Sequence, residues 1–472
     1  MATAGLHPRA ARRIIVRRLR LPISPTPPGS MLRTVLVVLA LAALPAAASA
    51  QVRTDTPPVA PASAVTAAPT TSYAAPATSA DTGAVAVPPA SEQALRYERS
   101  GNVLWVVDTL WALLLPLALL FTGLSARIRD LARRVGRKWY FTLAVYGALV
   151  SLVFWVVSLP LAYYEEFVRE HAYGLSTQSA GKWFGDSVKA LLVGMAAFAL
   201  IMWVPYLLLR KSPRRWWLWT AAAAVPLLAV VFWVSPVVVD PLFNRFGPMH
   251  DRALEARILA EAERAGIEGS RVFEVDKSAD TKALNAYVTG FGGSKRIVLW
   301  DTIIRKMDAR ELLFVLGHEM GHYVLRHVLM LMAAATLLIL LALWAMHRSA
   351  GWALGRWSGR FGFSRLDDVA SYPLLLVVVS LVSFAATPVF LAFSRHLEHE
   401  ADRFGLELTR DNHAAATAFV KLQTENLATP YHSTLYKLWH DSHPPLGERI
   451  EFCNTYRPWA EGKPLRYGGH FR

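Results

Sequence analysis

Two histidines four residues apart, with a glutamate directly after the first, could carry chemistry in this sequence: His318, Glu319 and His322. The surrounding pattern predicts a helix that begins at Asp308, which can form a capping box with Glu311. Side chains four apart share one face of a helix, so both imidazoles can bind one tetrahedral zinc ion. Glu319 can then act as general base toward a zinc-bound water. The alternative is a pair of structural histidines on an ordinary helix.

Composition indicates a membrane protein, because 54% of the 472 residues are apolar and only 18% are charged. A single cysteine, Cys453, excludes an internal disulfide and a cysteine-based zinc cluster, so a metal must be held by histidines and carboxylates. Of the net charge of +15, seven charges are arginines before residue 51, and much of the rest lies in short loops. This distribution follows the positive-inside rule and indicates no nucleic-acid binding.

The first 95 residues are predicted to be a targeting segment and a tether. Met31, a candidate initiator, precedes an apolar stretch and the small-residue site Ala48-Ser49-Ala50, a pattern typical of a secretory signal. An uncleaved anchor helix is the alternative. Residues 51–95 are rich in Ala, Pro, Thr and Ser without periodicity, which predicts a disordered tether.

Six apolar runs that follow are each long enough to cross a bilayer as a helix. They cover residues 103–123, 140–163, 187–209, 216–238, 326–347 and 371–393. Basic loops alternate with an acidic loop at 164–186, so the basic loops are predicted to face the cytoplasm. We therefore expect a multi-pass protein of the inner (cell) membrane whose segments 239–325 and 394–472 are periplasmic.

The predicted fold class is mainly α, a polytopic membrane bundle with a small α+β domain. Segment 239–325 should contain a helix near 252–265, a strand at 271–275 and a hairpin that includes Asn285-Ala286-Tyr287. Segment 394–472 should contain helices near 395–408 and 414–426. The full division is a targeting segment 1–50, a tether 51–95, a four-span bundle 96–238, a segment 239–325, a two-span hairpin 326–393 and a C-terminal segment 394–472.

A third zinc ligand must lie on an element that returns to the membrane face of His318. Two spans, an even number, separate His318 from Glu398 and Asp402, which share one helix face. Glu398 as ligand, with Asp402 accepting an imidazole N–H, would complete a site with an open fourth position. The alternative is a charged turn in which Arg395 pairs with Glu398.

Three further histidines near these residues are interpreted as bystanders. His396 and His399 flank Glu398 but are not expected to replace it as ligand. His327 lies five residues past His322, which on one continuous helix places it off that face.

Four ordered motifs together resemble the integral-membrane zinc peptidases of the CAAX prenyl protease 1 type, over about residues 103 to 455. They are the HExxH sequence, the segment Ser394-Arg395-x-x-Glu398-x-x-Ala401-Asp402, the hairpin with Asn285-Ala286-Tyr287, and Ser442-His443-Pro444-Pro445. Eukaryotic members of that family carry an additional leading span, where this chain has the signal-like segment.

The resemblance implies a gluzincin-like domain with one zinc ion per chain. By this resemblance, the zinc ligands are His318, His322 and Glu398, and the catalytic base is Glu319. Asp402 takes a proton-donor or ligand-orienting role, and His443 contacts the scissile carbonyl. The edge strand that pairs with the peptide includes Asn285, Ala286 and Tyr287. An exposed strand edge suits a protease that holds an extended backbone, and a histidine donor suits a developing oxyanion. Without the resemblance, a turn residue and a loop cap are the simpler interpretations of Asn285 and His443.

The leading functional hypothesis is a membrane-embedded zinc metalloendopeptidase that hydrolyses membrane-associated polypeptides, with CAAX-type processing implied by the resemblance. An HtpX-like quality-control protease would share the ligands. Site-2-type cleavage fits less well, because the Leu366-Asp367-Asp368 sequence lies in a predicted basic loop. A non-enzymatic transporter or scaffold would spread polar residues through several spans, whereas here they gather at two helix ends. The expected partners are a polypeptide substrate and the lipid bilayer.

Overall fold

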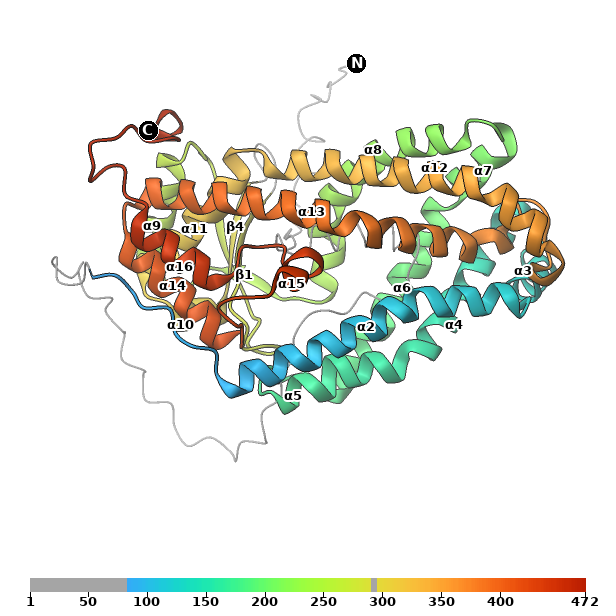
Figure 1. The fold of residues 1–472 in the computed structure, drawn as a ribbon, viewed down its shortest axis with the longest axis horizontal. Coiled ribbons are helices and arrows are strands. Elements are labelled where there is room, and N and C mark those ends of the chain that lie inside the picture. Colours follow the sequence, from blue (N-terminus) through green and yellow to red (C-terminus); the bar gives the residue numbers. More distant parts are fainter. Residues whose placement is uncertain (1–82, 290–294) are drawn as a thin grey trace, which may run out of the picture.

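The computed structural model describes residues 83–289 and 295–472, so the predicted signal segment and most of the predicted tether lie outside it. The described chain forms a bundle of long helices that leads into a smaller domain of short helices and one sheet (Figure 1). The predicted fold class, a helical membrane bundle with a small α+β domain, is confirmed.

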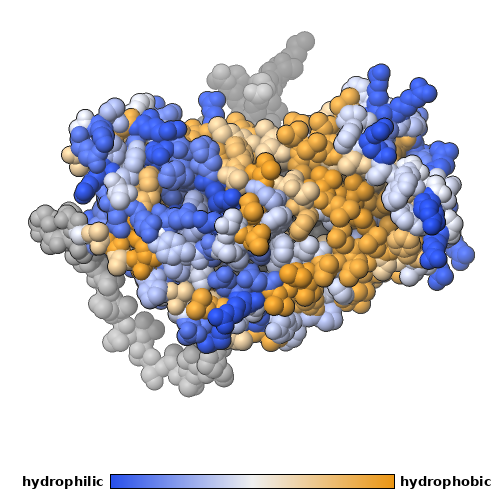
Figure 2. Space-filling view, viewed as in Figure 1, coloured by the Kyte–Doolittle hydropathy of each residue, from blue (hydrophilic) through white to orange (hydrophobic). Residues whose placement is uncertain are grey.

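Six helical segments of the described chain are long and apolar enough to cross a membrane, as predicted. They are α2 (Glu92–Phe121), α4 (Trp139–Tyr163) with its extension η1 (Tyr164–Arg169) and α5 (Glu170–Ala172), α6 (Ala180–Ile201) with α7 (Trp203–Lys211), α8 (Trp216–Val234), α12 (His327–Phe361) and α13 (Tyr372–Thr409). Apolar residues gather over the middle of the bundle, between hydrophilic ends (Figure 2). This arrangement fits a bilayer around the middle of the helices.

The last two spans are longer than the sequence predicted. Helix α12 continues to Phe361, through much of the predicted basic loop, and α13 includes the predicted separate helix 395–408. Neither extension contains a proline, and Pro388 is accommodated within the membrane part of α13. The continuous α13 therefore carries the polar cluster around Glu398 as an extension of a membrane span.

The end of the predicted tether is ordered. The Val85 backbone N–H donates to the Asn454 side chain and its carbonyl accepts from the same side chain, both at 2.9 Å. The Gln423 side chain donates to the carbonyl of Pro88 at 2.9 Å, and α2 begins at Glu92. The boundary predicted at residue 95 was therefore too late, because composition does not reveal these side-chain contacts to the backbone.

A four-stranded sheet forms one layer of the α+β domain, in the order β1-β2-β4-β3. The strands are β1 (Phe246–Pro248), β2 (Arg271–Val275), β3 (Ala286–Thr289) and β4 (Arg296–Trp300). Strands β2 and β4 are parallel, and β3 pairs with β4 as the predicted antiparallel hairpin, with Tyr287 opposite Val298. Strand β3 is thus an edge strand, and none of the described residues adds a strand to its outer side.

Short helices complete the α+β domain. They are α9 (Arg252–Arg264), α10 (Asp301–Lys306), α11 (Ala309–Val324), α14 (Asn412–Glu425), α15 (Thr434–Trp439) and α16 (Leu446–Thr455). The predicted capping box starts α11: Asp308 accepts from the Glu311 backbone at 3.0 Å, and Glu311 accepts from the Asp308 backbone at 2.8 Å. Ile297 and Leu299 of β4 share an apolar core with Leu312 and Leu316 of α11, which fixes α11 against the sheet.

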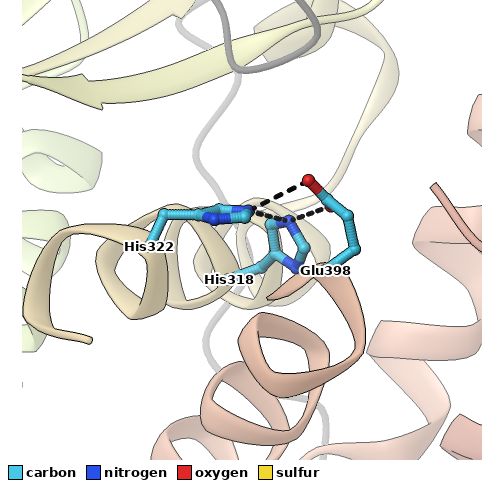
Figure 3. Close-up of side chains that lie close together, drawn as sticks. All are labelled: His318, His322 and Glu398. Atoms are coloured by element: carbon cyan, nitrogen blue, oxygen red, sulfur yellow. Dashed lines mark hydrogen bonds and ion pairs between the residues drawn. The ribbon is translucent and has the colours of Figure 1, made fainter. Parts of the chain in front are cut away.

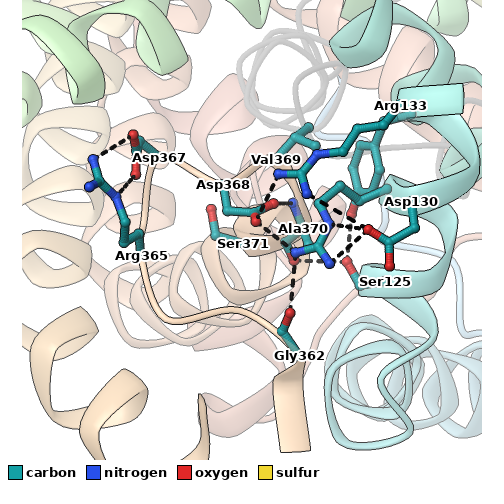
Figure 4. A network of polar contacts seen from close by, with 12 residues as sticks. Ser125, Asp130, Arg133, Gly362, Arg365, Asp367, Asp368, Val369, Ala370 and Ser371 are labelled. Carbon is teal, nitrogen blue, oxygen red and sulfur yellow. Dashed lines mark hydrogen bonds and ion pairs between the residues drawn. The ribbon is translucent and has the colours of Figure 1, made fainter. Parts of the chain in front are cut away.

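A buried polar network holds the opposite end of the bundle together (Figure 4). Arg129, on helix α3 (Leu124–Gly136), donates to Asp368 at 2.6 Å and to the carbonyl of Gly362 at 3.2 Å. Ser125 of the same helix donates to the carbonyl of Ala370 at 2.8 Å. These contacts join α3 to the connection between α12 and α13, where α13 begins.

Replacing Arg129 tests this network. Arg129→Ala removes the shortest hydrogen bond to the Asp368 carboxylate, which keeps the Ala370 backbone N–H and Arg133 as donors, and it removes the Arg129 donor from the Gly362 carbonyl. We therefore expect a loss of about 1–3 kcal/mol and a lower melting temperature in detergent. The matched control is Arg365→Ala, which breaks the exposed pair of Arg365 with Asp367 and should not change the melting temperature. Equal melting temperatures for the two variants would contradict a stabilising role for the network.

Candidate functional site

Helices α11 and α13 cross at a distance that only glycine permits. A Cβ atom on Gly405 of α13 would lie 2.9 Å from the backbone nitrogen of His318, and one on Gly317 of α11 would lie 3.3 Å from the Gly405 Cα. On Gly321, one turn further along α11, a Cβ would lie 3.0 Å from Phe404. The crossing therefore brings the polar face of α13 directly against the HExxH face of α11.

Three buried side chains converge at this crossing (Figure 3). The Nε2 atoms of His318 and His322 are 3.1 Å apart. The Glu398 carboxylate lies 3.3 Å from Nε2 of His318 and 3.4 Å from Nε2 of His322. The structure thus brings together the three residues predicted as metal ligands.

The electrostatics of this group favour a bound cation. Glu398 Oε2 is buried 3.2 Å from Nε2 of His443 and 3.3 Å from Nε2 of His318, but it forms no well-aligned hydrogen bond within the described chain, which is costly for a carboxylate. Burial lowers the pKa of His318, but its contacts with the Asp402 and Glu398 carboxylates outweigh burial and raise the pKa to about 9. Two histidine nitrogens and one carboxylate that face each other away from water are a donor set suited to a metal ion.

Asp402 lies within hydrogen-bond distance of His318, one of the two imidazoles that it was expected to contact, and it accepts hydrogen bonds from Arg449 of α16. The Asp402 carboxylate lies 2.8 Å from Nδ1 of His318, and Arg449 donates to its two oxygens at 2.9 and 2.5 Å. The Arg449 guanidinium also lies 4.1 Å from the centre of the Phe419 ring. The sequence analysis missed Arg449, although it was detectable as a charged residue on the apolar face formed by Ile450 and Cys453.

His327 lies beside His322, although it is not part of the group His318, His322 and Glu398 that could hold a metal. It is buried, and its Nδ1 lies 3.0 Å from Nδ1 of His322. The predicted position away from His322 was wrong because it assumed one continuous helix. Helix α11 ends at Val324, and Arg326 adopts a left-handed conformation with φ of 59° before α12 begins at His327.

Glu319 and His443 complete the polar surroundings of the group. Glu319 is buried, and burial raises its pKa despite the opposing effect of His318 and His322. His443 Nε2 lies 3.2 Å from the Glu398 carboxylate, and its Nδ1 lies 2.9 Å from the Ser442 hydroxyl. Burial lowers the pKa of His443, which favours a neutral ring. If the Ser442 hydroxyl donates to Nδ1, the Nε2–H of His443 points toward the metal-binding group.

The predicted substrate-binding residues lie at and next to the edge strand β3. The carbonyl of Asn285 accepts from the Trp300 backbone at 3.1 Å, and Ala286 is in register with Leu299. Tyr287 is buried beneath the strand in a cluster with Val298. Strand β3 contacts α11, the helix that carries His318 and His322.

The remaining residues of the polar cluster have other partners. Arg395 donates to the carbonyls of Lys437 and Asp441 at 2.6 and 2.7 Å. The alternative in which Arg395 pairs with Glu398 was therefore wrong. His399 lies 3.2 Å from the Arg403 guanidinium, and His396 is exposed. Neither histidine belongs to the metal-binding group, as expected.

Comparisons with known proteins cover both parts of the chain. Residues 248–456 match the model of peptidase family M48, and residues 84–245 match the CAAX prenyl protease N-terminal model, described as five membrane helices. Four of the candidate spans in the described chain lie within that second match.

Individual relatives give the same result. The chain is 35% identical over 358 residues to the uncharacterized metalloprotease YhfN of Bacillus subtilis, with 76% of this chain and 84% of that protein covered. It is 30% identical over 381 residues to a CAAX prenyl protease 1 homolog of Dictyostelium discoideum, covering 76% and 83%. The crystal structure of S. mikatae Ste24p superposes with a TM-score of 0.66 at 26% identity, over 76% of this chain and 87% of that one.

Because these similarities extend through the membrane bundle as well as the HExxH domain, they are not explained by a short motif. The chain is a multi-pass membrane metalloprotease. Within that class it belongs to peptidase family M48, and the resemblance to CAAX prenyl protease 1 that the four motifs indicated is confirmed.

Replacing Arg449 tests how the site is held. Arg449→Met keeps an unbranched side chain but removes the positive charge that pairs with the buried Asp402 carboxylate. We therefore expect lower metal content and a stability loss of about 3–5 kcal/mol. Metal per chain and the melting temperature of the purified protein measure the two effects. Arg257→Met, on the exposed face of α9, is the control and should change neither. Full metal content with unchanged melting in Arg449→Met would refute the role of this arginine.

Proposed function

We propose that the metal is zinc, held by Nε2 of His318, Nε2 of His322 and the carboxylate of Glu398. Two histidines and one carboxylate are a donor set of catalytic zinc sites, which keep a fourth position open. Ligand atoms about 2.0–2.1 Å from a tetrahedral zinc ion lie roughly 3.4 Å from one another. The two Nε2 atoms lie 3.1 Å apart, Oε2 of Glu398 lies 3.3 Å from Nε2 of His318, and Oε1 of Glu398 lies 3.4 Å from Nε2 of His322. Both carboxylate oxygens thus face the histidine nitrogens at about the expected separation, and this is the observation that carries the proposal.

The reaction is peptide-bond hydrolysis. Zinc, when bound in such a site, activates a water molecule and polarises the scissile carbonyl. Glu319 takes the proton of the attacking water and passes it to the leaving amine, a role that a buried carboxylate with a raised pKa suits. His443 donates its Nε2–H to the oxyanion that forms on the carbonyl. Asp402 keeps the His318 ring in place by accepting its Nδ1–H.

The substrate we propose is a membrane-associated polypeptide that binds in an extended conformation along β3. The outer edge of this strand, to which none of the described residues adds a further strand, offers backbone groups to a peptide, and β3 contacts α11. Asn285, Ala286 and Tyr287 lie at and next to this strand. Relatives named CAAX prenyl protease 1 support processing of CAAX-type polypeptides. The match to the N-terminal membrane region of those proteases favours this function over an HtpX-like one.

We further propose that the protein lies in the cell membrane with its active site on the periplasmic side. The exposed basic residues Arg133, Arg214 and Arg365 lie at connections between spans, at the end opposite to the α+β domain. Basic connections are retained in the cytoplasm, so the α+β domain would lie outside.

Cysteine labelling tests this orientation. The native Cys453 is fully buried, so it should remain silent toward a membrane-impermeant maleimide. In intact spheroplasts we expect labelling of Arg257→Cys in the α+β domain, and labelling of Arg365→Cys only after the membrane is permeabilised. The reverse pattern would place the active site in the cytoplasm.

Removing the general base tests the reaction. Glu319→Gln keeps the size of the side chain but cannot accept a proton, so we expect zinc content and melting temperature to be retained while peptide hydrolysis falls by about 10²–10⁴-fold. Glu263→Gln, the same change on the exposed surface of α9, is the control and should retain activity.

Two results would overturn the proposal. Wild-type protein that is purified without chelators and holds no zinc would refute the zinc site. Undiminished hydrolysis by Glu319→Gln would refute the mechanism even if zinc were present.

A further inference from the structure

We propose that His327 is a positioning residue for the metal site: its Nδ1 accepts the Nδ1–H of His322 and so fixes the orientation and tautomer of that ligand. The inference rests on the proposed zinc site. Its direct observation is the distance of 3.0 Å between the two Nδ1 atoms, with ring centres 5.0 Å apart and ring planes inclined by 77°.

The tautomers follow from the geometry. Nε2 of His322 faces Nε2 of His318 and the Glu398 carboxylate, so this is the nitrogen that binds the metal and carries no proton. A neutral His322 must then carry its proton on Nδ1. Within the described chain, the hydrogen-bond partner of that atom is Nδ1 of His327. His327 accepts only if its own proton is on Nε2, so one arrangement of protons satisfies the contact.

The turn after α11 produces this contact. Five residues along a continuous helix correspond to about 500° of rotation, which would point His327 away from His322. The left-handed Arg326, with φ of 59° and ψ of 32°, breaks the helix and begins α12 in a new direction. Such a conformation costs a non-glycine residue about 1–2 kcal/mol, so the surrounding packing maintains it. His327 is buried as a result, although it is polar.

The two metal-binding histidines therefore have different second partners. His318 donates to Asp402, a carboxylate whose charge is balanced by Arg449. His322 donates to a neutral imidazole, which adds no further negative charge beside Glu398 and Glu319. A carboxylate at position 327 would need its own counter-ion in a buried site, which explains why a neutral acceptor is suitable there.

A buried histidine that only fills space would make the same packing contacts without holding His322. The two roles differ in which substitution is tolerated. His327→Asn places an amide oxygen at about the position of the imidazole Nδ1 and retains an acceptor, although it is smaller. His327→Leu fills more of the space but accepts no hydrogen bond.

The experiment measures zinc affinity of the purified full-length protein in detergent by competition with a chromophoric chelator. We expect His327→Leu to bind zinc about 10–100-fold more weakly than wild type, the usual effect of losing such a partner. His327→Asn should remain within about threefold of wild type, because the acceptor is kept. The visible spectrum of the Co²⁺-substituted protein should change in His327→Leu and resemble wild type in His327→Asn. His396→Gln, an exposed histidine outside the metal-binding group, is the control and should bind zinc as wild type does.

The outcomes separate the inference from the zinc proposal. If wild type binds zinc and His327→Leu binds it equally well, or if Asn and Leu weaken binding to the same extent, the positioning role is refuted while the zinc site stands. If wild type binds no zinc, both are refuted. Should His327→Leu fail to fold, His327→Ala takes its place, since removing atoms introduces no clash, and it must bind zinc at least tenfold more weakly than His327→Asn.

Discussion

The close crossing of α11 and α13 is the constraint on which the metal-binding group depends. His318 and His322 come from one helix, and Glu398 and Asp402 come from another that is 80 residues away in the sequence. Glycines at the crossing let the two backbones approach until a Cβ on Gly405 would meet the His318 nitrogen at 2.9 Å. Any larger residue would separate the helices, and the carboxylates would withdraw from the histidines. The glycines are thus required for the close approach that brings His318, His322 and Glu398 together.

The position of α13 is in turn fixed far from the site. Its first turn follows Asp368, which Arg129 of α3 holds through a buried ion pair. Its last turns are covered by the C-terminal tail, where the backbone N–H groups of Arg466 and Tyr467 donate to buried Glu407 at 2.9 and 2.7 Å. Because α13 is one continuous helix, the polar contacts at its two ends hold the same element that carries Glu398 and Asp402.

Those parts of the site that obey a local periodicity were predictable from the sequence. The capping box of Asp308 and Glu311, the strand 271–275 and the β3–β4 hairpin follow from spacing and residue type. Spacing also predicted that Asp402 contacts an imidazole, and the structure shows that this imidazole is His318. The contacts of His327 and Arg449 were not predicted. The first depends on one left-handed residue between two helices, and the second on a side chain that reaches the site from α16. Single-residue backbone conformations and tertiary approaches leave no periodic signal.

The site also has a defined distance from the membrane. Glu398 lies 26 residues after the start of α13 at Tyr372, which is about 39 Å along a helix with a rise of about 1.5 Å per residue. The hydrocarbon core of a bilayer is about 30 Å thick, so a span that begins at one boundary of the core carries Glu398 roughly 10 Å beyond the other. His322 is placed similarly, because only a short turn separates α11 from span α12. Glu398 and His322 are thus both carried close to the end of a membrane span. To reach them, a peptide bond must come within roughly 10 Å of the hydrocarbon core, which is about two helical turns. A substrate attached to the bilayer satisfies this condition before it binds, which agrees with the membrane-associated polypeptide proposed here.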